Sequence, residues 1–311
     1  MSVAERRAVD WLLESREPAI RYLARRDLLD EVAEDDAARI LDGRIVQTLL
    51  NGPDDVHPYK KWTGAHWRLV SLVELAVPAG VPRALQAAGT VLDWLCSDSH
   101  RRTVQVIDGL ARRCASQEGN ALGVCVRIGL AGDARVELLA RSLVEWQWPD
   151  GGWNCDKRAS GRSSSFHESC APMWGLHEYA AATGATWARD AAFRAAEMFL
   201  AKRLFRSPRT GEVLRRAYLD LRYPPFWHYD VLQGLLVLSR VGVVRDPRAA
   251  EALDVVETRR GADGRWRANG YWWKTPGSDG SNVEIVDWGR GGPSEMVTLN
   301  ALRVLRAAGR A

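Results

Sequence analysis

The sequence repeats one unit, in which an apolar helix is followed by a short turn and an amphipathic helix. The clearest copy joins residues 119–131, which are small and apolar on nearly every side, to residues 134–147, which are apolar along one side. A helix of the first kind is typically buried all round, and one of the second kind covers a core with one face. The apolar helices end near residues 75, 128, 179, 241 and 308. This recurrence is typical of a repeat architecture and constrains the fold more than any local signal.

Three further copies follow the same plan. They join residues 65–79 to 82–96, residues 166–182 to 187–203, and residues 226–241 to 247–260. Residues 295–308 form a last inner helix with no partner after it, and we expect it to pair with a helix near residues 7–14 and so close a ring. Strand signals are scarce. The sequence therefore predicts an all-α chain with a single domain over residues 1–311.

Composition and charge narrow the class of protein. The 311 residues are 46% hydrophobic and 26% charged, as in a globular chain with a large core. The net charge is +4 and no block of basic residues occurs, so we expect no nucleic-acid partner. The first 18 residues carry charges throughout, and no run reaches ~18 apolar residues, so neither a signal peptide nor an integral membrane segment is expected.

Cysteine usage favours a reducing compartment. The five cysteines have irregular spacings, which argues against a disulfide framework and for a cytoplasmic protein. Cys114 and Cys125 stand among apolar residues, and we expect them to pack as small hydrophobic side chains.

Two of the loops between copies share a turn. Residues 149–153 read Pro-Asp-Gly-Gly-Trp and residues 262–266 read Ala-Asp-Gly-Arg-Trp, in which Asp-Gly is a turn signal. With Gln147, the first loop resembles the Gln-x-x-Asp-Gly-Gly-Trp repeat motif of squalene cyclases and of protein prenyltransferase β subunits. The resemblance covers the chain from about residue 60 onward. It implies a single α/α toroid, a barrel of inner helices inside a ring of outer helices; an open helical solenoid is the alternative.

Three residues with metal-binding side chains lie where inner helices are predicted to begin. Cys155 follows the first shared turn, His167 opens residues 166–182, and His228 opens residues 226–241. The beginnings of inner helices meet at one mouth of a toroid, so we predict that these three side chains hold zinc and leave a fourth position open. Taken singly, each histidine is more often a hydrogen-bonding residue than a ligand.

The family resemblance bears on this ligand set. Residues 227–230 (Trp-His-Tyr-Asp) resemble the segment in which protein prenyltransferases place their zinc histidine, here His228. Their preceding inner helix supplies an Asp-x-Cys pair, whereas here residues 165–170 read Ser-Phe-His-Glu-Ser-Cys. This departure leaves the remaining ligands open. Cys155 is the preferred third ligand, with Cys170 and Asp156 as alternatives.

Carboxylates near these ligands are candidates for catalysis. Glu168 is adjacent to His167 and could act as a general base toward a zinc-bound water, or simply complement the helix dipole. Asp156 and Asp230 stand next to proposed ligands, where a carboxylate often orients an imidazole.

Basic and aromatic residues are candidates for substrate binding. Lys157 and Arg158 resemble in position the basic residues that hold an isoprenoid diphosphate in prenyltransferases; a solvated loop is the alternative. Aromatic side chains could line a cavity for an isoprenoid chain. These are Trp62, Trp67, Trp174, Trp227, Tyr229, Trp272 and Trp273.

We therefore expect a zinc-dependent enzyme that acts on a hydrophobic or prenyl-like small molecule, as a transferase, a lyase or cyclase, or a hydrolase. The metal would act as a Lewis acid or would activate a water or thiol. One alternative is a non-catalytic toroid that binds a ligand or protein partner. Another is a metal-free enzyme that uses Asp230 as an acid, although the Asp-x-Asp-Asp motif of squalene cyclases is absent. A partner subunit, as in the prenyltransferase heterodimers, is also possible.

Overall fold

The computed structural model describes residues 2–310, and the regular structure within them is almost entirely helical. These residues form 14 α-helices, three short 3₁₀ helices and one hairpin made of β1 (Gln105–Ile107) and β2 (Leu110–Arg112). The prediction of an all-α chain is confirmed. Between residues 2 and 310, no helix has both the length and the apolar character needed to cross a membrane.

The predicted helical hairpins form close to their expected bounds. They are α5 (Ala65–Glu74) with α6 (Pro82–Cys96), α8 (Ser116–Arg127) with α9 (Ala134–Glu145), α10 (Phe166–Thr183) with α11 (Thr186–Ala201), and α12 (Val231–Val241) with α13 (Ala250–Thr258). Two bounds differ by five residues, because α5 ends at Glu74 and not at residue 79, and α12 begins at Val231 and not at residue 226. The carboxylate of Asp230 caps the helix there by accepting a hydrogen bond from the Gln233 N–H group.

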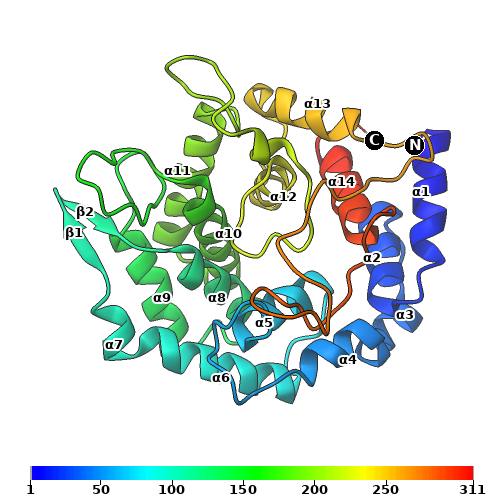
Figure 1. Cartoon of the computed structure of the whole chain (residues 1–311), viewed down its shortest axis with the longest axis horizontal. Helices are drawn as coiled ribbons and strands as arrows, with labels where there is room; N and C mark the ends of the chain where they lie inside the picture. Colours follow the sequence, from blue (N-terminus) through cyan, green and yellow to red (C-terminus); the bar gives the residue numbers. More distant parts are fainter. Residues whose placement is uncertain (1, 311) are drawn as a thin grey trace.

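One helix of each hairpin lies toward the centre of the molecule. In sequence order α5, α8, α10 and α12 pack on one another, and α12 packs on α14 (Glu295–Ala307). Helix α14 in turn packs on α2 (Pro18–Leu28) and α1 (Val3–Leu13). Figure 1 shows α5, α8, α10, α12 and α14 grouped around the centre, with α6, α9, α11, α13 and α1 outside them. We call α2, α5, α8, α10, α12 and α14 the inner helices.

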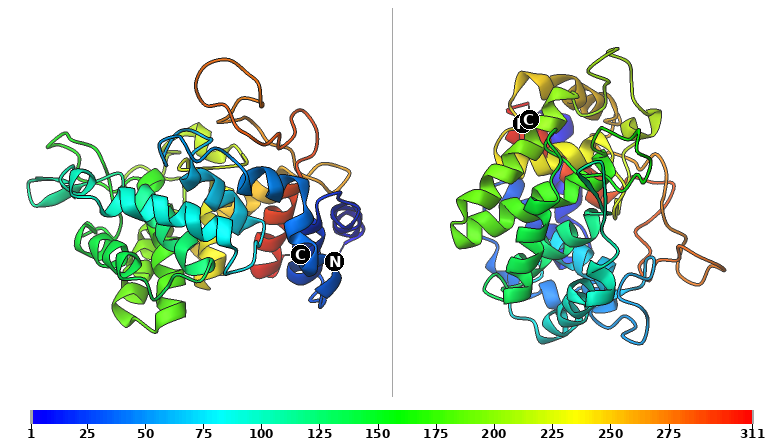
Figure 2. Two further views of the ribbon diagram at one scale, coloured as in Figure 1. Left: turned by 90° about the horizontal axis from the view of Figure 1, so that it is seen from below. Right: turned by 90° about the vertical axis from the view of Figure 1, so that its left-hand side faces the viewer.

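The remaining elements connect these helices. Between α2 and α5 lie α3 (Glu34–Ala38), η1 (Ile40–Asp42) and α4 (Arg44–Leu50). Helix α7 (Asp98–Arg101) precedes the β-hairpin, while η2 (Arg216–Leu219) and η3 (Pro247–Ala249) precede α12 and α13. The long connection between α13 and α14 stands out from one face of the molecule (Figure 2).

The two shared turns have the same hydrogen bonds. In the first, the Trp153 indole N–H donates to the carbonyl of Leu143 in α9 at 2.8 Å. In the second, the Trp266 indole N–H donates to the carbonyl of Val256 in α13 at 2.7 Å. Both tryptophans are buried. Each therefore ties the turn back to the outer helix before it, and the two loops are structural copies of one unit.

A glycine in each turn also packs on the next outer helix. Gly151 has φ +96° and Gly264 has φ +82°, a left-handed conformation that disfavours other residues. A Cβ atom would lie 2.3 Å from the Arg194 carbonyl of α11 at Gly151, and 2.0 Å from the Ala4 carbonyl of α1 at Gly264. Helix α1 thus takes the same place beside α14 that α11 takes beside α10, as expected from the unpaired last helix.

Candidate functional site

Two thiols and one carboxyl group converge near the beginnings of α8 and α10. Cys155 follows the first shared turn, Cys114 precedes α8, and Glu168 lies in the first turn of α10. The Sγ atoms of the two cysteines and one oxygen of Glu168 all lie within 4.8 Å of one another. In the part of the chain that the structure describes, these three side chains are the group whose ligand atoms lie close enough together to hold a metal ion.

Backbone pairing explains why the two cysteines meet. Residues 112 and 154 form a parallel β-bridge, and the Arg113 N–H group donates to the Asn154 carbonyl at 3.1 Å. The segment before α8 therefore runs beside the segment after the shared turn. This pairing brings Cys114 next to Cys155, and neither local sequence indicates it.

Close packing of α8 on α10 brings Glu168 to the same place. A Cβ atom added at Gly119 would lie 2.3 Å from the backbone nitrogen of Pro172, so the two helices approach at a position without a side chain. Near this contact the Ser116 N–H group at the start of α8 donates to Oε2 of Glu168 at 3.1 Å. The carboxyl group is buried, and burial raises its pKa although the hydrogen bond from Ser116 lowers it.

One separation in this group can be compared with that of a metal site. The Cys155 thiol donates to Oε1 of Glu168 at 3.5 Å. Two ligands of one tetrahedral zinc ion, with bonds of about 2.3 Å to sulfur and about 2.0 Å to oxygen, lie about 3.5 Å apart. The separation of this pair is therefore compatible with a shared metal ion.

The surroundings of Cys155 disfavour its thiolate form. The neighbouring Cys114 thiol, burial and the nearby Glu168 carboxyl together raise the pKa of Cys155. A bound metal would have to offset this rise, because the thiolate is the form of cysteine that binds metals.

His167 lies in the first turn of α10 but is bonded to another element. Its Nδ1 atom accepts a hydrogen bond from the Tyr229 N–H group at 2.9 Å, so the neutral ring carries its proton on Nε2. Burial lowers the pKa of His167 to about 4. The imidazole is therefore neutral at pH 7.

His228 lies between two indole rings. Its ring stacks on Trp227 at a centroid distance of 3.9 Å and on Trp272 at 3.8 Å. Its Nδ1–H group donates to the Pro225 carbonyl at 3.3 Å, which leaves Nε2 with a free lone pair. Burial and the neighbouring His167 lower its pKa to about 3.

The structure thus divides the predicted ligands between two neighbouring groups. The centroids of His167 and His228 are 6.3 Å apart, with the rings nearly perpendicular. Cys155 is joined instead to Cys114 and Glu168, and in residues 2–310 it forms no close ligand group with the two histidines. We therefore revise the predicted set. Cys114, expected to be a small core residue, takes part in the group, whereas Cys125 is buried as predicted.

Among the described residues, neither of the alternative ligands, Cys170 and Asp156, belongs to this group of ligand atoms. Cys170 is buried, its Sγ atom lies 3.9 Å from the Gln233 carbonyl, and burial raises its pKa. Asp156 pairs with Arg158 at 2.7 Å, and this contact lowers the pKa of the carboxyl to about 2. Lys157 and Arg158 are exposed, and their predicted contact with a diphosphate stays a prediction.

Asp230 has a role in the local fold. One of its oxygens accepts from the Gln233 N–H group at 3.0 Å, and the other accepts from the Arg222 N–H group at 3.1 Å. Burial raises the pKa of this carboxyl to about 7. Within residues 2–310 neither of its oxygens bonds an imidazole, so Asp230 caps α12 and does not orient His167 or His228.

The candidate aromatic residues lie in three places. Trp227, Trp272 and Trp273 belong to a cluster with Trp62, Trp67 and Phe226 near the beginnings of the inner helices. Tyr229 is buried elsewhere, where its hydroxyl donates to the Leu204 carbonyl at 2.7 Å. Trp174 lines a pocket at the other end of the inner helices.

Comparison of the chain with protein-family models, with curated proteins and with solved structures gave no match. The resemblance to squalene cyclases and protein prenyltransferases, and the activity that it implies, therefore stay predictions from the sequence.

Proposed function

We propose that this protein is a zinc-dependent enzyme whose metal is held by Cys114, Cys155 and Glu168. The proposal rests on one observation, the convergence of three ligand atoms from separate segments to within 4.8 Å of one another. Two thiolates and one carboxylate form a zinc site with a fourth position for water or substrate. All five cysteines are free, which suits a reducing compartment such as the cytoplasm.

We further propose that the inner helices form a closed α/α toroid. Successive inner helices from α5 to α14 pack on one another, and α14 packs on α1 and α2, which supports closure. The repeated contacts of Trp153 and Trp266 support an internal repeat. In such a barrel the beginnings of the inner helices would surround the metal.

The neighbouring residues suit the chemistry of such a site. Zinc would supply Lewis acidity and lower the pKa of a bound water or thiol. The low pKa of His228 keeps its Nε2 lone pair unprotonated at pH 7, so this atom can accept a hydrogen bond from a substrate. His228 covers one face of Trp227 and one face of Trp272, and the half-buried remainder of these indoles offers apolar surface to a hydrophobic or prenyl-like molecule.

Metal analysis of the purified protein tests the ligand set. We expect about one zinc ion per chain, and loss of most of it in Cys155→Ser and Glu168→Gln. Cys96→Ser is the matched control, since this half-buried thiol lies outside the group, and it should keep its zinc. His167→Ala separates the revised set from the first one because it should also keep its zinc. Wild-type zinc content in Cys155→Ser and Glu168→Gln would contradict the proposal.

A second candidate is a toroid that binds a ligand or partner without chemistry. One observation favours it: the rings of Trp62 and Phe226 in the aromatic cluster stack on each other at 3.9 Å and are both buried. These two rings therefore pack as core and do not line a cavity for a substrate. It predicts no bound zinc. The metal-free acid mechanism has less support, because both oxygens of Asp230 already accept backbone hydrogen bonds.

A further inference from the structure

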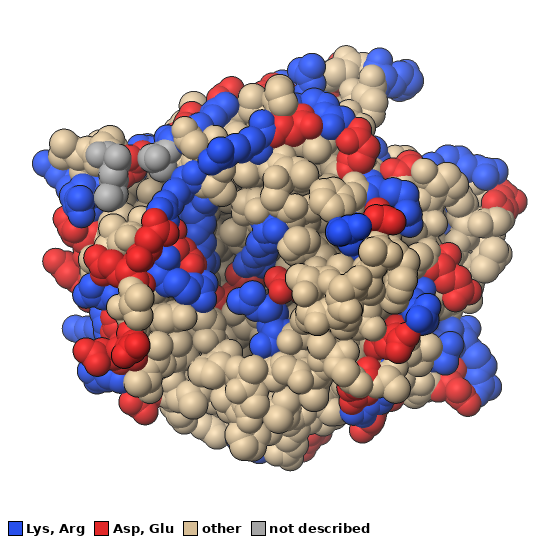
Figure 3. Space-filling view, turned by 180° about the vertical axis from the view of Figure 1, so that it is seen from behind, with Lys and Arg blue, Asp and Glu red and all other residues tan. Residues whose placement is uncertain are grey.

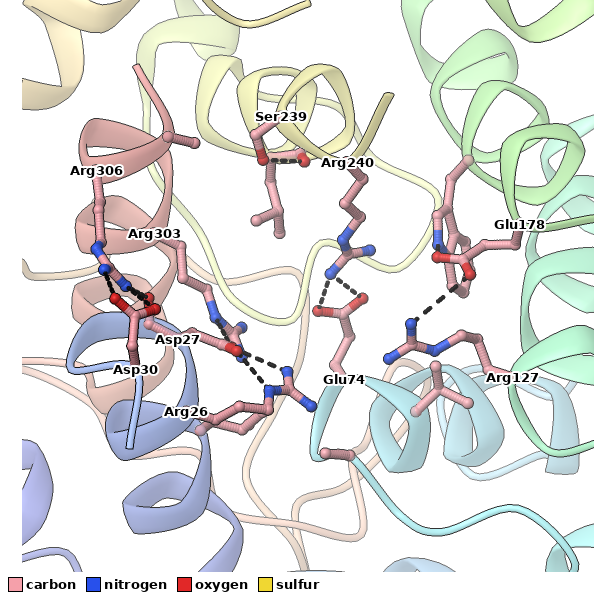
Figure 4. A pocket seen from close by; sticks show the side chains of 16 residues that line it. Arg26, Asp27, Asp30, Glu74, Arg127, Glu178, Ser239, Arg240, Arg303 and Arg306 are labelled. Atoms are coloured by element: carbon pink, nitrogen blue, oxygen red, sulfur yellow. Dashed lines mark hydrogen bonds and ion pairs between the residues drawn. The ribbon is translucent and has the colours of Figure 1, made fainter. Parts of the chain in front are cut away.

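A pocket of about 540 Å³ lies at the opposite end of the inner helices from Cys155. Its lining comes from the C-terminal halves of several inner helices, including Glu74 of α5, Arg127 of α8, Glu178 of α10 and Arg240 of α12 (Figure 4). Seen from behind, the molecule is hollowed here, and basic side chains lie within the hollow (Figure 3). We propose that this pocket binds a small organic anion, a molecule with a carboxylate or phosphate group and an apolar part.

The pocket is unusually rich in charge. Five arginines line it together with four acidic residues: Arg26, Arg127, Arg240, Arg303, Arg306, Asp27, Asp30, Glu74 and Glu178. Partly buried charges are costly unless they are paired. The contacts of each arginine therefore show which of them have donors left for a ligand.

The arginines on one side of the pocket are occupied by the protein. Arg303 donates from Nε to Asp27 at 2.7 Å and from Nη1 to Asn300 at 2.9 Å. Arg306 donates to the Asp27 carbonyl at 2.6 Å and pairs with Asp30. These contacts join α14 to α2 and to the residues that directly follow α2. We therefore infer that Arg303 and Arg306 stabilise the fold and do not bind the ligand.

Arg240 is held in place but keeps free donors. Its Nη2 atom donates to both oxygens of Glu74, at 2.9 and 2.8 Å, and its guanidinium lies 5.6 Å from the ring centroid of Trp174. A guanidinium has five N–H groups. In the described residues those on Nε and Nη1 have no protein acceptor. Glu74 and Trp174 thus position Arg240 while leaving part of its fork open beside the pocket.

Arg127 is even less engaged. Within residues 2–310 it makes no hydrogen bond, and its closest carboxylate oxygen, on Glu178, is 3.7 Å away. Glu178 instead accepts from the Trp174 indole N–H group at 2.9 Å. Figure 4 shows Arg127 and Arg240 reaching toward the same part of the pocket from α8 and α12. Two guanidinium groups with open donors suit an oxyanion, which each can bind through paired hydrogen bonds.

The rest of the lining sets the character of the ligand. The side chains of Trp174, Val73, Leu236 and Leu23 offer apolar contacts in the same pocket. Its volume lies in the range that holds small organic molecules. Glu178 is ten residues beyond Glu168 on α10, so the pocket is about 15 Å from the metal-binding group. The inference therefore does not depend on the proposed zinc site.

Both arginines lie in the last turn of a helix, where a cation is favourable without any ligand. A binding measurement is therefore decisive. Calorimetric titration would use octanoate, octyl phosphate and neutral octanol, which share one alkyl chain. We expect wild-type protein to bind at least one of the two anions more tightly than octanol. Preference between the anions identifies the head group.

Substitutions of Arg127 and Arg240 test whether these two residues bind the anion. Arg127→Gln should weaken anion binding by about tenfold or more, and Arg127→Lys should lie between it and the wild type. Arg141→Gln, an exposed arginine of α9 that pairs with Glu137, is the matched control and should bind as the wild type does. The double variant Glu74→Gln with Arg240→Gln should also bind weakly, without leaving Glu74 unpaired. Equal binding of octanol and the anions, no anion binding, or unchanged binding by Arg127→Gln would overturn the inference.

Discussion

His66, on α5, is a histidine without hydrogen bonds in a closed environment. Its side chain is 1% exposed, and in the described part of the chain neither ring nitrogen has a partner. The rings of Tyr59 and Trp67 pack against it at centroid distances of 5.2 and 4.6 Å. Burial, with a smaller effect of His100, lowers the pKa of His66 to about 3 from the usual 6.5. The folded chain therefore holds a neutral imidazole there.

This shift links protonation of His66 to unfolding. Between pH 6.5 and 3 the unfolded chain binds the proton and the folded chain does not, so stability falls as the pH decreases below 6.5. At pH 5 the loss from this residue is about 2 kcal/mol. His66→Phe should remove it. The free energy of unfolding, measured with urea, should therefore fall less between pH 7.5 and pH 5 in His66→Phe than in wild type, by about 2 kcal/mol. An equal fall in the two proteins would refute this account.

The group of Cys114, Cys155 and Glu168 shows what single residues reveal in a sequence. Cys155 was predicted as a ligand because it follows a recognisable turn, whereas Glu168, in the first turn of an apolar helix, was predicted as a general base. Cys114 could not be predicted as a ligand, since its neighbours give no sign that residues 112–114 run beside residue 154. His167 and His228 were expected to point at Cys155. Their positions depend instead on bonds to Tyr229 and Pro225, which are properties of the folded loop before α12.

At the level of elements, the two shared turns tie α9 to α11 and α13 to α1. Gly151 combines φ +96° with a backbone oxygen only 2.3 Å from where a Cβ atom would lie. Gly151→Ala should therefore lower the free energy of unfolding by about 2 kcal/mol or more. Gly132→Ala is the matched control, since a Cβ atom there meets nothing within 4 Å. It should change stability by less than about 1 kcal/mol in thermal or urea unfolding. Similar losses in the two variants would contradict the packing role of Gly151.

Helix bounds were predicted well where the spacing of apolar residues determines them. They were predicted less well where a capping residue determines the end of the helix. The hairpins α8–α9 and α10–α11 lie within a few residues of the sequence prediction, since their apolar positions recur at helical spacing. The predicted start of α12 was five residues early, because its apolar and aromatic residues continue through Phe226 and Trp227. The sequence did carry the correct signal in Asp230 and Gln233, which have the spacing of a helix cap.

At the scale of the whole molecule, the two ends of the sequence come together. Asp27 on α2 pairs with Arg303 on α14 at 2.5 Å, and Arg260 after α13 pairs with Glu5 on α1 at 3.1 Å. The N and C labels lie side by side in Figures 1 and 2. The unpaired last helix predicted that such a contact exists. The pocket behind it was not predicted, because Glu74, Arg240 and Arg303 are distant in sequence and each resembles an ordinary helix-end charge.

Asp27 provides a test of how strongly this contact joins the molecule. Its side chain is 18% exposed and that of Arg303 is 12% exposed, so Asp27→Asn leaves a largely buried guanidinium without its carboxylate. We expect the free energy of unfolding to fall by about 3 kcal/mol. Asp35→Asn, an exposed control on α3, should change it by less than about 0.5 kcal/mol. Hydrogen exchange should show faster opening of α1, α2 and α14 in Asp27→Asn than in wild type. Unchanged exchange in these three helices would mean that apolar packing alone holds the ends of the chain together.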